Sequence, residues 1–488
     1  MSQHEFHAHE EIRYEVSSDS ETHLLQKLPK TSGQMLSILF LLILPVFLEQ
    51  ILIIGVTFSD NFLTAKYLDT EYIAAISSAG YITWLMQCIF CFVSVGVTAM
   101  VARFCGEWNT RMASKVMNQA LMIGMIFALA FFVFLLFYLN PMVDFLRLQG
   151  NAGGYAKTYL WIILPSLPFI MISCVGLAAL RGAGNMVCGL WIMTVVNIVS
   201  VVISWGLVLG VGPLPRLGWE GVALGTTAGF TVGGLATLAV LWRGSYGLKL
   251  DLRQMLPDMN LIRRILWISV PGGLDMMTII GCQFWFLGLI NTLGVASSAA
   301  HGVALRVESF GFSPLVAFQL AIMTLVGQFL GAKRSDLAVR ATYFTLGISL
   351  TFVSVMGFIF FAWAESLPFI LLKYESVELA ATVAELLRII ALAMPACALM
   401  MVLAGVLRGA GDTRFPLFIS LFGFLCIRIL GTYFLAFPEM HLRSLGITIP
   451  GMNLGVAGAW MAMTVDVWIR SLMLLGRFLY GKWKRIEV

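Results

Sequence analysis

Charged residues are scarce in this chain: only 12% of its 488 residues are Asp, Glu, Lys or Arg, whereas 59% are hydrophobic. A water-soluble protein of this length carries roughly twice that charged fraction. Apolar stretches long enough to cross a bilayer recur along the whole chain. They are continuous, not alternating, which favours helices over barrel strands. The sequence therefore predicts an all-α integral membrane protein.

Motifs of catalysis and of nucleotide binding are also lacking. The sequence contains no Walker motif, no HExxH and no GxSxG, so we expect neither direct use of ATP nor an enzyme, and no cofactor. The net charge is only +5 and the basic residues are spread over short loops, which argues against a nucleic-acid partner. The first 34 residues are polar and lack the apolar core of a secretory signal.

The apolar stretches divide the chain into twelve predicted spans with a basic connection in the middle. Most Lys and Arg lie in the tails and in loops on one side, so the positive-inside rule places both termini in the cytoplasm, in a cytoplasmic (inner) membrane. We expect a polar tail (1–34), two lobes (35–243 and 262–480), a linker (244–261) and a basic tail (481–488). The spans are predicted at 35–62, 82–104, 116–139, 159–180, 187–211, 222–242, 262–292, 310–330, 339–363, 384–407, 415–437 and 456–479.

Several short segments occur twice, in the same order in each half of the chain. Leu-Arg-Gly-Ala-Gly at 180–184 recurs at 407–411, and the proline before it, Pro168, recurs as Pro395. Pro45 in the first span matches Pro271 in the seventh. Because each half has an even number of spans, both insert in the same orientation. The sequence predicts two pseudo-symmetric six-helix bundles, related as a parallel repeat.

This layout resembles the multidrug and toxic-compound extrusion (MATE) transporters. The similarity extends over roughly 35–480 and includes the stretch from Pro45 to Asp60, both Arg-Gly-Ala-Gly turns, Gly-Gln-Phe-Leu-Gly at 327–331 and Gly-Val-Ala at 221–223. The resemblance implies two six-helix lobes around a V-shaped cleft. It also implies alternating access, with small organic compounds exported in exchange for H⁺ or Na⁺. Polysaccharide and lipid-linked-precursor flippases look similar as well.

The resemblance points to a coupling site in the N-terminal lobe at Asp60, Asn197 and Thr226. A carboxylate held away from water takes up a proton more readily. When ionised, it binds Na⁺ together with amide and hydroxyl oxygens. The alternative is structural: Asp60 caps a helix end and Asn197 joins two helices. Apart from such a Na⁺ site, we expect no metal.

Other acids inside the spans are secondary candidates, because ionisable groups are costly there. Glu49 and Asp275 each lie four residues after a proline, at equivalent places in the two halves, and either line a pocket or bond to another helix. Glu308 begins span eight and is not expected to pair with Arg306. Asp466 lies four residues before Arg470, which is pairing distance on a helix. Arg428 needs an acid of the same lobe.

The chain departs from the family pattern at three positions where other members carry acids. These positions hold Val201, Ile279 and Cys397. The resemblance therefore leaves open whether the coupling site is reduced or moved.

The alternatives to an exporter are a lipid-linked oligosaccharide flippase, a membrane-embedded transferase and a non-transporting scaffold. A flippase for anionic cargo needs a cavity rich in Arg and Lys, whereas acids match or outnumber bases in these spans. This balance favours cationic, amphipathic cargo. We expect small organic substrates and the lipid bilayer as partners, and a monomer.

Overall fold

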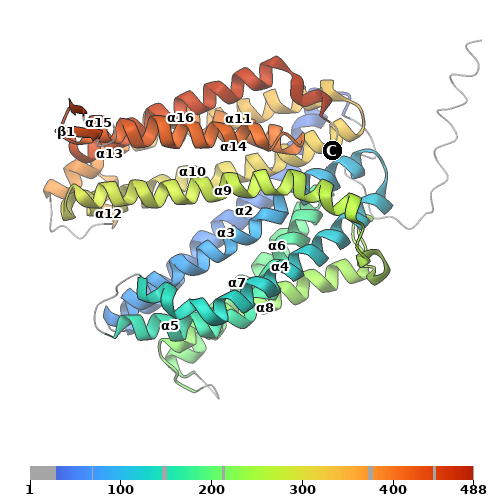
Figure 1. The fold of residues 1–488 in the computed structure, drawn as a ribbon, viewed down its shortest axis with the longest axis horizontal. Coiled ribbons are helices and arrows are strands. Elements are labelled where there is room, and N and C mark those ends of the chain that lie inside the picture. Colours follow the sequence, from blue (N-terminus) through green and yellow to red (C-terminus); the bar gives the residue numbers. More distant parts are fainter. Residues whose placement is uncertain are drawn as a thin grey trace, which may run out of the picture.

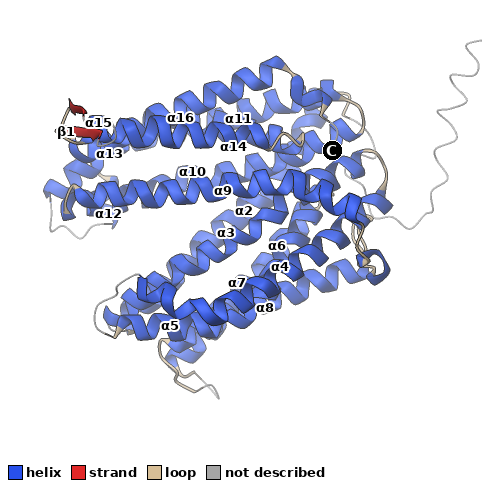
Figure 2. Cartoon of the chain, in the orientation of Figure 1, coloured by secondary structure: helices blue, strands red, loops and turns tan. Residues whose placement is uncertain are grey.

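The computed structural model describes residues 29–68, 70–145, 151–211, 215–371, 377–442 and 447–486. These residues include 12 helices long and apolar enough to cross a membrane. Figure 2 shows that the described chain is almost entirely helical, with one small strand pair. The predicted all-α membrane fold is confirmed.

The N-terminal lobe begins with a helix whose start is fixed by a capping box. The Thr31 side chain accepts a hydrogen bond from the Gln34 backbone, and the Gln34 side chain accepts one from the backbone of Thr31. The helices run beyond the predicted spans because an apolar window marks only the part inside hydrocarbon. The elements of this lobe are α2 (Ser32–Tyr67), α3 (Thr70–Gly106), α4 (Thr110–Phe145), α5 (Ala152–Ile163), η1 (Leu164–Ser166), α6 (Leu167–Gly182), α7 (Met186–Leu209) and α8 (Glu220–Arg243).

The C-terminal lobe repeats this order and adds a hairpin. A short 3-10 turn, η2 (Leu252–Met255), lies between the lobes. In the hairpin, Glu439 pairs with Pro450 in antiparallel register. The elements are α9 (Met259–Thr292), α10 (Val295–Gly331), α11 (Ser335–Ala362), α12 (Leu367–Leu371), α13 (Val377–Gly409), α14 (Arg414–Phe422), the π-helix η3 (Gly423–Ile429), α15 (Leu430–Ala436), β1 (Glu439–Leu442), β2 (Ile447–Pro450), α16 (Gly455–Tyr480) and η4 (Lys482–Arg485).

Helix packing bears out the duplication. In the first half α3 packs on α6, α6 on α8 and α2 on α7. In the second half the equivalent pairs are α10 on α13, α13 on α16 and α9 on α14. The lobes meet through α3 with α9 and through α2 with α10, which are also equivalent pairs. The two halves therefore share one packing plan.

The ribbon has the shape of a V (Figure 1). The lobes approach each other at the end where the described chain starts and stops, which we call the terminal end, and diverge toward the opposite, far end. Glycines allow the close approach: a Cβ on Gly106 of α3 would collide with the carbonyl of Gln328, and one on Gly331 of α10 with the carbonyl of Arg103. The lobes are thus joined backbone to backbone at the terminal end.

The first helix of each lobe is shared between two hydrophobic cores. Residues of α2 from Met35 to Val46 belong to the cluster built mainly by the C-terminal lobe, whereas Leu63 belongs to the other cluster. Equivalently, Leu261 and Ile268 of α9 pack in the core of the N-terminal lobe. Each helix therefore crosses from one core to the other near its proline, Pro45 or Pro271.

The linker is held on α4. Asn118 and Gln119 are fully buried and bond to the linker backbone: Asn118 accepts from the amide of Asp251, and Gln119 donates to two linker carbonyls at 2.6 Å each. Lys115 pairs with Asp258 at 2.6 Å, and this pairing holds the pKa of Asp258 below its usual range. The linker thus belongs structurally to the N-terminal lobe up to the start of α9.

Candidate functional site

Asp60 lies on the far half of α2, against α7. Its neighbour Ser59 accepts a hydrogen bond from the indole of Trp205 on α7 at 3.0 Å, and Trp205 also stacks on Phe62. The Oδ1 atom of Asp60 is buried and has no hydrogen-bond partner within the described part of the chain. A carboxylate oxygen removed from water without a donor is costly.

Asn197 and Thr226 lie on two helices that pack closely together. Gly225 and Gly229 of α8 face α7, and a Cβ on either would press on the backbone of Ser200 or Val196. Thr226 donates to the carbonyl of Val222 at 3.0 Å.

The side chains of the predicted site are not joined to one another by any hydrogen bond found among the described residues. The amide nitrogen of Asn197 is buried and unpartnered there, like Oδ1 of Asp60. Tyr159 of α5 lies near Thr226 and within electrostatic range of Asp60. These side chains come from four elements, α2, α5, α7 and α8.

Glu49 and Asp275 form equivalent buried ion pairs. Glu49 of α2 accepts from Arg181 of α6 at 2.6 Å, and Asp275 of α9 accepts from Arg408 of α13 at 2.5 Å. Both arginines come from the repeated Arg-Gly-Ala-Gly segments. The open alternative for these two acids is therefore decided in favour of bonds between helices.

Asp466 is the centre of a second charged group, inside the C-terminal lobe. Its Oδ2 atom accepts from Arg470 at 2.8 Å, as the spacing predicts, and from Arg428 at 2.9 Å. Arg428 lies in the π-helix η3 and also donates to Gln283 of α9 at 3.2 Å. Gly423 makes room for the group, because a Cβ there would collide with Arg470. Two guanidinium groups thus share one carboxylate.

Glu308 lies beside this group without an ion pair. Its Oε2 atom is buried and has no partner among the described residues, although Arg428 is within electrostatic range. No ion pair between Glu308 and Arg306 is found among the described residues. Of the seven candidate residues, the two acids left without a guanidinium partner are therefore Asp60 in one lobe and Glu308 in the other.

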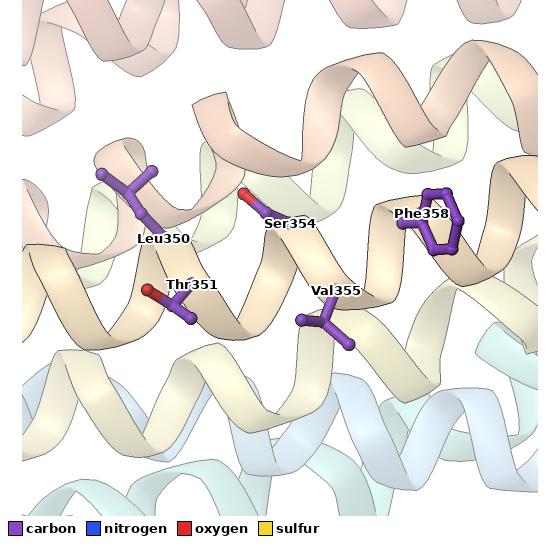
Figure 3. A pocket seen from close by; sticks show the side chains of 5 residues that line it. All are labelled: Leu350, Thr351, Ser354, Val355 and Phe358. Carbon is purple, nitrogen blue, oxygen red and sulfur yellow. The ribbon is translucent and has the colours of Figure 1, made fainter.

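The pocket in Figure 3 lies away from all of these acids. It has a volume of about 510 Å³ and lies along one face of α11, where Leu350, Thr351, Ser354, Val355 and Phe358 line it. No charged side chain lines it. This depression offers two hydroxyls and no charged group for an ion.

Arg181, Arg408 and Tyr159 are site residues that were missed from the sequence. The arginines stand in the repeated motif. Their nearly equal separation from the acids along the chain, 132 residues in one half and 133 in the other, is the signal that would have paired them. Tyr159 gives no such signal, because only folding brings α5 to α8. His301 is a further buried polar residue, which accepts a hydrogen bond from Trp460 at 3.1 Å.

Comparison with known proteins agrees with this geometry. The MatE family profile matches residues 45–205 and 271–434, one match in each lobe. A probable multidrug resistance protein NorM of Thermotoga maritima is 25% identical over 453 residues, which is 92% of this chain and 93% of that protein.

Two solved structures share the fold. One is a MOP superfamily transporter from Pyrococcus furiosus, with a TM-score of 0.82, 18% identity and coverage of 94% of this chain and 100% of that one. The other is an outward-facing multidrug resistance MATE family transporter, with a TM-score of 0.81 and the same identity and coverage. The chain therefore belongs to the MatE family of multidrug and toxic-compound transporters.

Proposed function

We propose that this protein is a secondary antiporter that exports small organic compounds in exchange for H⁺ or Na⁺, with Asp60 as the main coupling residue. The cation enters from the far end, which is the external side if both termini are cytoplasmic, and binds the carboxylate in the N-terminal lobe. The lobes then alternate access around the site.

One observation carries the proposal: among the described residues Asp60 has no guanidinium partner, whereas Glu49, Asp275 and Asp466 are each paired with arginine through one oxygen and keep only the other oxygen without a donor. A paired acid is already neutralised and gains little from a coupling cation. An unpaired one gains most, because a proton or Na⁺ supplies the missing partner. Glu308 has the same property and is the secondary candidate.

That the cargo is cationic stays a prediction, and the ion pairs remove part of the argument for it. Cationic cargo was expected because acids match or outnumber bases in the spans. The ion pairs account for three of those acids, so they attract no free cation in the cleft. The relatives include multidrug resistance proteins, and this favours an exporter over a flippase, a transferase or a scaffold.

Transport into inverted vesicles tests the proposal. Vesicles with the protein receive a fluorescent organic dye and either a pH gradient or a Na⁺ gradient, each imposed alone. We expect one gradient to drive dye uptake and the Asp60→Asn variant to lose at least about 90% of it, since the amide can neither take up a proton nor supply a negative charge for Na⁺. The Asp60→Glu variant should keep part of the uptake.

The matched control is Glu308→Gln, which removes the other unpaired acid. A smaller loss than that of Asp60→Asn is expected, with the same gradient still effective. The proposal fails if neither gradient moves any dye, or if Asp60→Asn transports like the unaltered protein. Equal losses in both variants would reject Asp60 as the main coupling residue.

A further inference from the structure

We propose that Arg306 of α10 faces the space between the lobes and binds an anionic group, a carboxylate or phosphate, on the exported compound. The inference rests on the proposed export function and specifies its cargo as anionic or zwitterionic organic compounds. Arg306 is exposed, and its guanidinium has no ion pair or hydrogen bond within the described residues.

The direction of the Arg306 side chain follows from contacts that the same helix makes about five turns further along. Near its end α10 touches the N-terminal lobe: Thr324 donates to the carbonyl of Arg181 at 3.0 Å, and Gly331 packs against Arg103. Eighteen residues make five turns of an α-helix, so residues eighteen apart lie on one face. Pro314 lies between the two positions, but α10 stays one continuous helix across it, so Arg306 lies on the same side of α10 as Thr324.

The face that carries Arg306 combines polar and apolar side chains. Arg306, Ser309 and Ser313 follow one another at helical spacing and none of them is buried, and Phe310, which is 52% exposed, lies on the same side. The opposite face is apolar and packs in the C-terminal lobe, where Gly311 touches Phe360 and Met394. The Arg306 face thus continues the lobe-facing side of α10 into the part where the lobes diverge (Figure 1).

A charged side chain in that position selects its ligand by charge. An arginine inside a span is costly unless it has an acid, water or a ligand to bind. The nearby acid Glu308 is directed to the interior, where its Oε2 atom is buried. Guanidinium binds carboxylate and phosphate through paired N–H donors, so the ligand expected for Arg306 is one of these groups.

The experiment uses two dyes that differ in a single group. Rhodamine B carries a free carboxylate, and its ethyl ester has the same ring system without it. Uptake of each is measured in inverted vesicles, and binding of each is measured by fluorescence anisotropy with the purified protein. We expect the Arg306→Gln variant to bind rhodamine B at least about tenfold more weakly while the ester is unaffected. The Arg306→Lys variant should retain part of the preference.

The control is Arg388→Gln, because Arg388 is exposed but already paired with Glu365 at 2.7 Å. It should change neither dye. The inference is overturned if Arg306→Gln affects both dyes equally or affects neither. It is also overturned if the effect appears only when the vesicles contain anionic lipid, since Arg306 would then bind a lipid headgroup. Failure of the proposed function is a separate result: neither dye is transported, while the anisotropy still reports on Arg306.

Discussion

Arginine partners decide which acids of this transporter are available for ions. Glu49 and Asp275 each face a guanidinium from the repeated motif, and Asp466 holds two. A buried ion pair of this kind contributes little net stability compared with an apolar pair. The loss of one partner, however, leaves a buried charge with neither a counter-charge nor water around it. These acids are thus structural, and the proposed coupling falls to the unpaired ones.

Breaking one of the pairs should therefore destabilise the fold strongly. We expect Asp275→Ala to lower the free energy of unfolding by about 3 to 5 kcal/mol, because Arg408 would remain buried without a counter-charge. Replacing both residues by leucine should cost less than the single change. Thermal unfolding in detergent, followed by tryptophan fluorescence, measures both.

An exposed pair provides the comparison. Asp336 accepts from Arg334 at 2.9 Å, and both side chains are exposed. Asp336→Ala should cost about 0 to 1 kcal/mol. A result in which Asp275→Ala and Asp336→Ala shift unfolding equally would show that burial adds nothing to the first pair.

At the scale of elements, two side chains on one turn of α4 hold the linker and so determine where the lobes can move relative to each other. Asn118 and Gln119 bond to the linker backbone through both their donor and their acceptor atoms. The linker carries two basic and two acidic residues and lacks helical structure apart from η2, so these bonds, together with those between Ser114 and Lys249, order its backbone. Relative motion of the lobes must be taken up outside the linker, at the start of α9.

Removal of this clamp should free the linker without unfolding the helices. We expect the double variant Asn118→Ala, Gln119→Ala to be cut by trypsin at Lys249 or Arg253 at least about tenfold faster than the unaltered protein, because cleavage needs a locally open chain. Mass spectrometry of the fragments measures the site and rate.

The control is Lys115→Ala, which removes only the half-exposed ion pair with Asp258. Because the pKa of Asp258 is lowered in the fold, the stabilisation by that pair is present at neutral pH and is lost as the pH falls through the lowered pKa. At neutral pH we expect Lys115→Ala to change cleavage less than the double variant. Equal cleavage of all three proteins would reject the clamp.

At the scale of the whole molecule, the lobes are interlocked at one end and separate at the other (Figure 1). The first turns of α2 and α9 each pack in the opposite lobe, and Gly106 and Gly331 bring the backbones of α3 and α10 together. The conformation is thus the one in which the terminal end is closed. A transporter that alternates access must loosen this contact.

A side chain at the crossing should shift that equilibrium. In the Gly331→Ala variant the new methyl group meets the carbonyl of Arg103, so the closed terminal end becomes less stable. Spin labels at the exposed positions Val211 and Val295 on the far end report the opening. We expect a larger population of short distances than in the unaltered protein, since the far end closes as the terminal end opens.

Gly347→Ala is the matched control, because no atom lies near a Cβ at that position of α11. Its distance distribution should equal that of the unaltered protein. If Gly331→Ala also leaves the distribution unchanged, the crossing at Gly106 and Gly331 does not hold the terminal end closed.

The sequence by itself determined the helices, the spans and the duplication. Membrane-spanning backbone must satisfy its own hydrogen bonds, so apolar length alone predicts a helix. The pairing of Asp466 with Arg470 was also predictable, because helical spacing of four residues is a local property. The repeated segments alone predicted the two lobes.

Only the tertiary structure decided which charges are neutralised and which face the space between the lobes. Glu49 and Arg181 are distant in the chain, as are Arg428 and Asp466, and no local rule pairs them. The resemblance singled out Asp60, but the sequence could not show that Glu49, Asp275 and Asp466 are paired with arginine. It also did not set Glu308 and Arg306 apart from the other charged residues of the spans. Ion pairing and burial depend on which helix faces are brought together, and that is settled by long-range packing.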